Sequence, residues 1–402
     1  MRTGVPRALL CVSIVFGLVG AVGCSAERPA TRAAACDSPG VSADQVKAGL
    51  VLSDTGVGSV AMSSARSGLD ARIGLANAEG GVRGRQIVYR WRDDAGSPSQ
   101  NAQVTKDLVD HESVLGIVAV TTALGGSLDE TQARGIPVVG LAVPSWAEYQ
   151  NLFAYAYETS PQTVGRYILQ GGGKKVGILV TGTAESVIQS ANEYREDFEA
   201  VGLATAAPIS YASSTDSPLQ VARQLAAAGV DSLVGLTSAE DFAAVVKAAR
   251  EAGPDLAVSV TLSGYARSLL PSLGPALAGV SIPVYFRPFE AGGDALGRYR
   301  EAMNRYAPET TQPEQEFAMY GYLFADMFIR GLDLAGDCPT REGFISALRG
   351  VSDYDAGGLL APVDLGANAR QPLSCYAFVQ VNPSGTAFGV ARERLCADGT
   401  GR

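Results

Sequence analysis

The chain has 402 residues, of which 47% are hydrophobic and 18% charged, and its formal net charge is -9. This composition is sufficient for a large core, and the length favours two domains over one. It argues against a protein that binds nucleic acid, because an acidic chain without a basic patch cannot neutralise phosphates.

Residues 1–23 have the features of an export signal. Two arginines precede an apolar stretch at 8–22, which is followed by small residues. A charged start, a short apolar region and a small-residue exit define such a signal, and the apolar region is too short to predict a membrane span. We therefore expect export and removal of this segment.

The four residues Ala21-Val22-Gly23-Cys24 resemble a bacterial lipobox, although Ala21 replaces the usual Leu. This predicts that Cys24 is lipidated and anchors the protein to the outer face of the cytoplasmic membrane. An ordinary cleaved signal with an unmodified Cys24 is the alternative. Residues 24–45 would then form a tether, because 25–37 are rich in Ala, Arg and Pro without an apolar period.

From residue 46 onward, short apolar runs alternate with segments of helical periodicity. The first series predicts strands at 46–52, 86–91, 115–120 and 137–142, and helices at 63–78, 99–111 and 124–134. The second predicts helices at 163–170, 186–201, 219–228 and 239–251, and strands at 175–180, 232–236, 256–262 and 280–285. Helices at 291–306 and 317–335, a helix opening at Thr340 and a hairpin over 376–391 complete the chain.

Buried strands separated by helices indicate parallel sheets covered by helices on both faces. We therefore predict an α/β protein with two Rossmann-like lobes joined by a hinge of three crossovers. Lobe 1 would comprise 46–158 plus 287–373, and lobe 2 would comprise 159–286 plus 374–402. Ligands of open α/β sheets bind at the carboxyl ends of the strands. The loops expected there are 53–60, 121–126, 142–146, 181–186, 237–241 and 263–267.

Four cysteines remain after Cys11 and Cys24 are set aside, and an even number in an exported protein suggests disulfides. Three pairings are possible. We favour Cys375–Cys396, since these residues flank the predicted hairpin, which leaves Cys36–Cys338. A metal site is the weaker alternative, because the spacings are long and His111 is the only histidine.

Catalytic chemistry is poorly represented. His111 follows a predicted helix and lies away from the strand-end loops, and no nucleophile elbow or phosphate-binding loop occurs in a suitable context. The Asp93-Asp94 pair could cap the next helix, contact a ligand or, less plausibly, act in catalysis. We expect no enzyme activity, no cofactor and no metal.

Several short motifs occur in a characteristic order. They are Val46–Val51 with Asp54-Thr55-Gly56, Asn77–Arg85, Asp93-Asp94 with Pro98 and Ala102, Gly135–Val139, Ala248–Gly253 and Tyr354–Leu359. Together they resemble the leucine/isoleucine/valine-binding protein family, the type I periplasmic binding proteins of ATP-driven importers, over about residues 40–395. The resemblance implies hinge closure on a small molecule and delivery to the permease subunits of an ABC transporter, by a protein that we expect to be a monomer.

The resemblance also implies a ligand site by position. The family's ligand-binding segments fall on Thr121, Thr122 and Ala123, on Ala142, Val143 and Pro144, on Glu185, and on Ser238 or Ala239. Pro144 and Glu185 replace a threonine and an aromatic residue of the family, and 261–267 lacks the family's acidic residue. Because an amino-acid zwitterion needs an opposite charge at each end, we expect a different small organic solute. Further candidates for contact with it are Met62, Trp146, Ser263 and Tyr265.

Two other functions stay open. The same two-lobed module could report a ligand to a membrane signalling partner instead of a transporter. An exported α/β enzyme is the second alternative.

Overall fold

Strands and helices alternate along the chain and build two separate sheets. The computed structural model describes residues 1, 36–56, 59–142, 144–182 and 184–401, so the predicted signal, Cys24 and most of the tether lie outside the described residues. The first sheet has the order β2-β1-β3-β4-β5, and all its paired strands are parallel. Its strands are β1 (Gln45–Leu52), β2 (Gln86–Asp93), β3 (Gly116–Val120), β4 (Val138–Gly140) and β5 (Leu152–Phe153).

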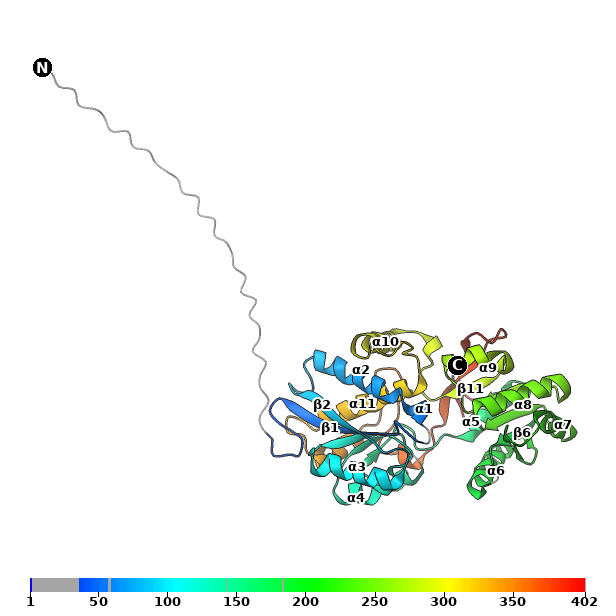
Figure 1. The fold of residues 1–402 in the computed structure, drawn as a ribbon, viewed down its shortest axis with the longest axis horizontal. Helices are drawn as coiled ribbons and strands as arrows, with labels where there is room; N and C mark the ends of the chain where they lie inside the picture. The colour runs from blue at the N-terminus through cyan, green and yellow to red at the C-terminus, as the bar shows by residue number, and fades with distance from the viewer. Residues whose placement is uncertain (2–35, 57–58, 143, 183, 402) are drawn as a thin grey trace. The chain divides into compact units, whose positions relative to one another are not determined.

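Helices cover both faces of this sheet (Figure 1). One face carries α2 (Ala65–Ala78), α10 (Asp294–Tyr306) and α11 (Glu316–Leu334), and the other carries α3 (Pro98–Asp110) and α4 (Leu128–Ala133). The short α1 (Ser59–Met62) and α12 (Arg341–Arg349) contact α11. Strand β1 is buried from both sides: Leu50 and Leu52 join the α2/α11 core, whereas Val51 joins the α3 core. This two-sided burial explains the continuous apolar run of the strand.

The second sheet has the order β13-β12-β11-β10-β9-β6-β7, and β8 pairs with β6. Its strands are β6 (Lys175–Val180), β7 (Ala204–Thr205), β8 (Ile209–Ser210), β9 (Ser232–Leu236), β10 (Val258–Thr261), β11 (Ser281–Val284), β12 (Cys375–Val381) and β13 (Phe388–Cys396). Its helices are α5 (Pro161–Gln170), α6 (Glu185–Ala200), α7 (Pro218–Ala227), α8 (Ala239–Ala252) and α9 (Leu270–Leu277). Strand β12 runs antiparallel to β11 and begins the expected C-terminal hairpin.

Two expected helices are shorter than their periodicity suggests, and glycines explain both. The segment 124–134 divides into a 3₁₀ turn, Leu124–Gly126, and α4. A Cβ on Gly126 would lie 1.8 Å from the carbonyl oxygen of Pro98, so this turn approaches the start of α3 closely. In the segment 291–306, Gly292 and Gly293 have φ of 61° and 96°, and α10 therefore begins only at Asp294.

Glycines also bring α2 and α11 into close contact. A Cβ on Gly68 would lie 1.7 Å from the carbonyl oxygen of Ala318, and a Cβ on Gly321 would lie 1.9 Å from that of Ala65. The two helices thus approach backbone to backbone. This contact fixes α11, which comes late in the chain, onto the first sheet.

The segments expected as crossovers, 157–161, 285–288 and 372–376, lie together. Thr159 forms a parallel bridge with Leu373, and the ring of Tyr285 lies 5.1 Å from that of Tyr376. The lobe boundaries proposed above follow the same chain path and remain predictions. No helix among the described residues is long and apolar enough to cross a bilayer.

The structure contains both disulfides in the favoured pairing. Cys375 and Cys396 are direct cross-strand partners of the β12–β13 hairpin, with Cα atoms 4.0 Å apart. Cys36 and Cys338 have Cα atoms 5.5 Å apart and link the start of the described domain to the segment after α11. Among the described residues, no cluster of His, Cys, Asp and Glu side chains is suited to hold a metal ion.

Candidate functional site

A buried carboxylate organises the strand ends of the first sheet. Asp94 has no exposed area and accepts hydrogen bonds from the hydroxyls of Ser53 at 2.9 Å and Thr121 at 2.6 Å. Asn101 Nδ2 donates to it at 2.9 Å, and the backbone N–H of Gly96 donates at 3.0 Å. Ser53, Gly96 and Thr121 lie in the loops that follow β1, β2 and β3. Asn101 lies on α3. Asp94 therefore locks three strand ends to one helix.

The neighbouring Asp93 holds the loop after β1. Its carboxylate accepts the hydroxyl of Thr55 and the backbone N–H groups of Asp54, Thr55 and Ala95, at 2.5 to 3.2 Å. Partial burial acts to raise the pKa of Asp93, but these hydrogen bonds outweigh it and lower the pKa. The side chains of Asp54 and Thr55 stay exposed at the edge of the sheet.

The second sheet presents a row of hydroxyl groups at its own strand ends. Thr181, Thr237 and Ser263 follow β6, β9 and β10, which are adjacent in the sheet. The hydroxyls of Thr181 and Thr237 are hydrogen-bonded to each other, and Ser263 Oγ donates to the carbonyl of Thr237 at 2.9 Å. We call Thr181, Thr237 and Ser263 the hydroxyl row. Thr181 is exposed and the other two are half-buried, so the row is open to a solute.

The residues expected in the first-sheet loops differ in their accessibility. Thr121 is only 1% exposed, and its hydroxyl is used by Asp94, by Ser53 and by the backbone N–H of Ala123. Ala123 is also buried, whereas Thr122 is exposed and Ala142 half-buried. Val143 lies outside the described residues, and Pro144 begins a 3₁₀ turn, Pro144–Glu148. Thr122 is therefore the side chain of this group that a solute could reach.

Three apolar candidates are core residues. Trp146 is 1% exposed and belongs to the core between the first sheet and α3, and Met62 belongs to the α2/α11 core. Tyr265 is 3% exposed, and its ring lies 5.6 Å from that of Phe289. Its hydroxyl donates to Glu290 Oε2 at 2.6 Å. In this structure these side chains stabilise the fold and offer little surface to a solute.

Glu185 and Ser238 are exposed at the starts of helices. Glu185 is the first residue of α6 and borders a shallow groove with Gln189 and Glu193. Ser238 is the N-cap of α8, where its hydroxyl accepts the backbone N–H of Asp241 at 3.1 Å. Ser238 is thus a helix cap adjacent to the hydroxyl row.

Within the described residues, the strand-end loops carry no unpaired cationic side chain. Arg267 is the basic residue of these loops, and it pairs with Glu290 at 3.1 Å and Glu314 at 2.8 Å. Glu314 also pairs with Arg300 at 2.7 Å. With this arginine neutralised, hydroxyl groups, backbone groups and the exposed Asp54 and Glu185 face the solvent at the strand ends in the described residues. This arrangement suits an uncharged solute better than an anion.

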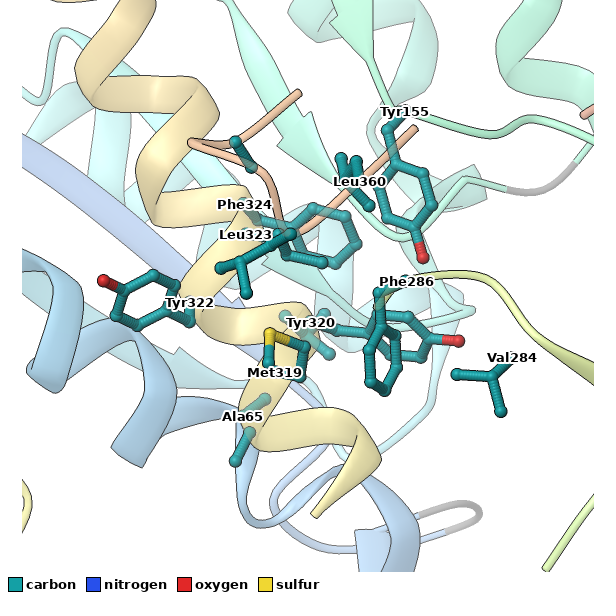
Figure 2. Packing of buried hydrophobic residues seen from close by; sticks show 14 of the residues in the cluster. Ala65, Tyr155, Val284, Phe286, Met319, Tyr320, Tyr322, Leu323, Phe324 and Leu360 are labelled. Atoms are coloured by element: carbon teal, nitrogen blue, oxygen red, sulfur yellow. The ribbon is translucent and has the colours of Figure 1, made fainter. Parts of the chain in front are cut away.

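An aromatic cluster lies where the crossovers meet the start of α11. Figure 2 shows Tyr155, Phe286, Tyr320 and Phe324 in this cluster, and the ring of Tyr155 lies 6.3 Å from that of Tyr320 and 6.2 Å from that of Phe324. The ring of Tyr320 lies 5.7 Å from that of Phe286, and its hydroxyl donates to Glu316 Oε1 at 2.9 Å. Burial raises the pKa of Glu316 to about 7, and the hydrogen bond from Tyr320 opposes this only in part. No motif in the sequence points to this carboxyl group.

A common sequence feature identifies the strand-end hydroxyls. A serine or threonine follows the buried strand at Leu52-Ser53, Val120-Thr121, Val180-Thr181 and Leu236-Thr237. The loop ranges predicted from the sequence include all four. The pattern alone does not distinguish the buried Ser53 and Thr121 from the accessible Thr181 and Thr237. The difference is made by Asp94, which binds the first two hydroxyls and follows a different strand, β2.

Comparison with known proteins agrees with this architecture. The model of the periplasmic binding protein family matches residues 45–387. A fatty acid ABC transporter substrate-binding protein from Thermomonospora curvata superposes with a TM-score of 0.72 at 20% identity, covering 90% of this chain and 96% of that one. No curated protein matches the sequence.

Two solved structures of similar fold contain bound ligands. LivJ from Streptococcus pneumoniae in complex with isoleucine has a TM-score of 0.67 at 15% identity, covering 87% of this chain and 99% of that one. A solute-binding protein of R. palustris in complex with benzoate has a TM-score of 0.67 at 16% identity, with coverage of 89% and 99%. With the family model spanning most of its length, this chain belongs to the periplasmic binding protein family, which binds solutes and does not transform them.

Proposed function

We propose that this protein is an extracytoplasmic lipoprotein that captures a small organic solute and delivers it to an ABC importer. The hydroxyl row carries the proposal, because it places three polar side chains at the strand ends, where open α/β sheets bind ligands. Exposed Thr122 and Thr55 offer hydroxyls at the strand ends of the first sheet. Closure of the two lobes would bring both sets to one solute.

The chemistry of these groups favours an uncharged solute with hydroxyl, carbonyl or amide groups. A buried anion needs a cation or several charge-assisted donors, and Arg267 is already paired with Glu290 and Glu314. Hydroxyl groups both donate and accept, so the row can serve either kind of polar atom on the solute. Isoleucine and benzoate, bound by similar folds, are charged, so we do not transfer them to this chain.

An exported location is supported by the disulfides, because such bonds persist in oxidising compartments. The lipid on Cys24 would hold the protein at the membrane, where the permease subunits of the importer receive the closed form. The protein would act as a monomer, with no cofactor.

A thermal-shift screen of amides, polyols, sugars and neutral amino-acid derivatives tests the proposal. A solute that binds only the folded state raises Tm. At a concentration of one hundred times Kd, it adds about 2.7 kcal/mol to the free energy of unfolding. Thr237→Val and Ser263→Ala should each weaken binding by roughly tenfold, because each removes about one hydrogen bond to the solute.

Ser346→Ala is the matched control, since Ser346 is an exposed hydroxyl residue on α12, in the part of the chain assigned to the other lobe. Its shift should equal that of the wild type. Equal shifts in the wild type, Thr237→Val and Ser263→Ala would show that the solute binds elsewhere.

A further inference from the structure

A cavity lies at the crossovers, apart from the hydroxyl row. It has a volume of about 470 Å³, and none of the residues predicted to bind the solute lines it. Its walls come from two of the crossover segments, represented by Tyr285 and Leu373, from Tyr155 shortly before the third, and from the segment around Leu360. This volume lies within the range of cavities that bind small organic molecules.

The order of the second sheet separates this cavity from the hydroxyl row. The cavity is lined by residues of β11, β12 and β13, for example Val284, Ala377 and Arg394. The hydroxyl row follows β10, β9 and β6, which continue the same sheet on the other side of β11. With strands about 4.8 Å apart, β12 and β9 are separated by roughly 14 Å, and the two places adjoin only at the neighbouring strands β11 and β10. The two places are therefore distinct halves of one sheet edge.

The charged groups of the cavity favour an anion. Arg287 and Arg394 line it, and in the described part of the chain neither guanidinium forms an ion pair with a carboxylate. Arg287 Nε donates to the carbonyl of Gly292 at 2.8 Å, which holds the side chain in place, and its terminal nitrogens form no hydrogen bond within the described residues. Arg394 contacts Cys375 Sγ at 3.4 Å. Among the described residues that line this cavity, Glu393 carries the one carboxylate.

The remaining walls are apolar or aromatic. Leu359 and Leu360 are buried beside the cavity, and the ring of Tyr285 stands edge-on against that of Tyr376 at 5.1 Å. Burial raises the pKa of Tyr285 to about 12, so the phenol stays neutral at physiological pH. A molecule in this cavity would meet two cationic groups at one part and hydrocarbon at another.

We propose that this cavity at the crossovers is a second ligand site, which binds an amphipathic carboxylate through Arg287 and Arg394. The carboxylate would pair with the guanidinium groups, and the apolar body would contact Tyr285 and Leu373, two half-buried residues of the lining. Because two crossovers form part of the walls, with Tyr155 close to the third, a molecule bound here has different contacts in the open and closed forms. Its binding and that of the solute therefore influence each other reciprocally.

Octanoate is a suitable probe, because it combines one carboxylate with an apolar chain. Titration calorimetry on the mature protein should show saturable binding of octanoate. Arg287→Gln and Arg394→Gln should each weaken this binding by roughly tenfold, since each removes a charge-assisted hydrogen bond. Octanamide, the uncharged analogue, should bind at least tenfold more weakly than octanoate.

Arg392→Gln is the matched control, because Arg392 is an exposed arginine two residues away on β13 that does not line the cavity. It should leave octanoate binding unchanged, and so should Thr237→Val in the hydroxyl row. If Arg287→Gln does not fold, the exposed Arg394 decides the question alone. The absence of saturable binding, equal binding of octanamide, or equal losses in Arg392→Gln and Arg394→Gln would each overturn this second site without affecting the proposed solute site.

Discussion

Ser53 and Thr121 differ from Thr181 and Thr237 in what their hydroxyl groups contact. In the first sheet the hydroxyls donate to buried Asp94, so their role is to hold three strand ends together. In the second sheet the hydroxyls bond to each other beside the solvent. The same residue type after a strand therefore supports the fold in one sheet and is available for binding in the other.

Asp94→Ala should lower the free energy of unfolding by at least about 3 kcal/mol, because it leaves the buried donors of Asn101 and Thr121 without an acceptor. Urea denaturation measures this loss. Asp353→Ala, in an exposed loop, should change stability by less than about 0.5 kcal/mol. Similar values for the two variants would contradict the role of Asp94.

Glu316 predicts a defined pH dependence. Its pKa is raised from 4.5 to about 7 in the folded state, so between these values the unfolded chain releases a proton that the folded protein keeps. Stability therefore falls as pH rises through this window and levels off above pH 7. Glu316→Gln removes the ionisation and should be about 2 kcal/mol more stable than the wild type at pH 8, after allowance for its partial exposure, with little difference at pH 4.

Urea denaturation of both proteins at pH 4 and pH 8 measures this difference. Tyr155, Tyr285 and Tyr320 face the carboxyl group, and burial keeps them neutral over this range. The nearby charges of Arg267, Glu290 and Glu314 are paired with one another and common to both proteins. A stability difference that does not change with pH would refute the assignment.

At the level of elements, the contact between α2 and α11 joins segments about 250 residues apart. Gly68 and Gly321 allow the two backbones to meet, and neither position tolerates a Cβ without movement of a carbonyl group. Because helix α11 follows every strand of the first sheet, this contact completes the core only after most of the chain is available.

Gly68→Ala should therefore destabilise the protein by about 1 to 3 kcal/mol, the usual cost of overpacking. Gly297→Ala is the control, because Gly297 lies on α10 with no atom near the added Cβ. Alanine is the better helix former, so Gly297→Ala should stabilise by up to about 1 kcal/mol. Thermal unfolding distinguishes the two outcomes, and a stabilising Gly68→Ala would show that the helices can separate at no cost.

Patterns along the chain predicted the elements better than the site. Continuous apolar runs such as 46–52 predict buried parallel strands because burial on both faces leaves no polar position. Trp146 and Tyr265 follow strands at positions where loops border a ligand site, yet they pack into the core. The packing of Tyr265 depends on Phe289 and on Phe388, more than 120 residues away. A pattern of neighbouring residues cannot predict such a distant contact. The position of Glu316 near Tyr155 was likewise not predictable, because the two residues are far apart in the sequence.

At the level of the whole molecule, the account requires two sheets whose strand-end groups act on one solute. Loops that carry hydroxyl groups follow strands of both sheets, and the chain passes between the sheets through three crossovers. A rigid protein with one binding surface would need hydroxyl-bearing loops on only one sheet. Because such loops follow strands of both sheets, we predict that the two lobes move toward each other when the solute binds.

Small-angle X-ray scattering with the solute found in the thermal-shift screen measures this movement directly. The account predicts that the radius of gyration of the wild type decreases when the solute saturates the protein, and that Thr237→Val at the same concentration shows a smaller decrease because less of it is bound. An unchanged radius of gyration in the fully bound wild type would contradict capture of the solute by closure.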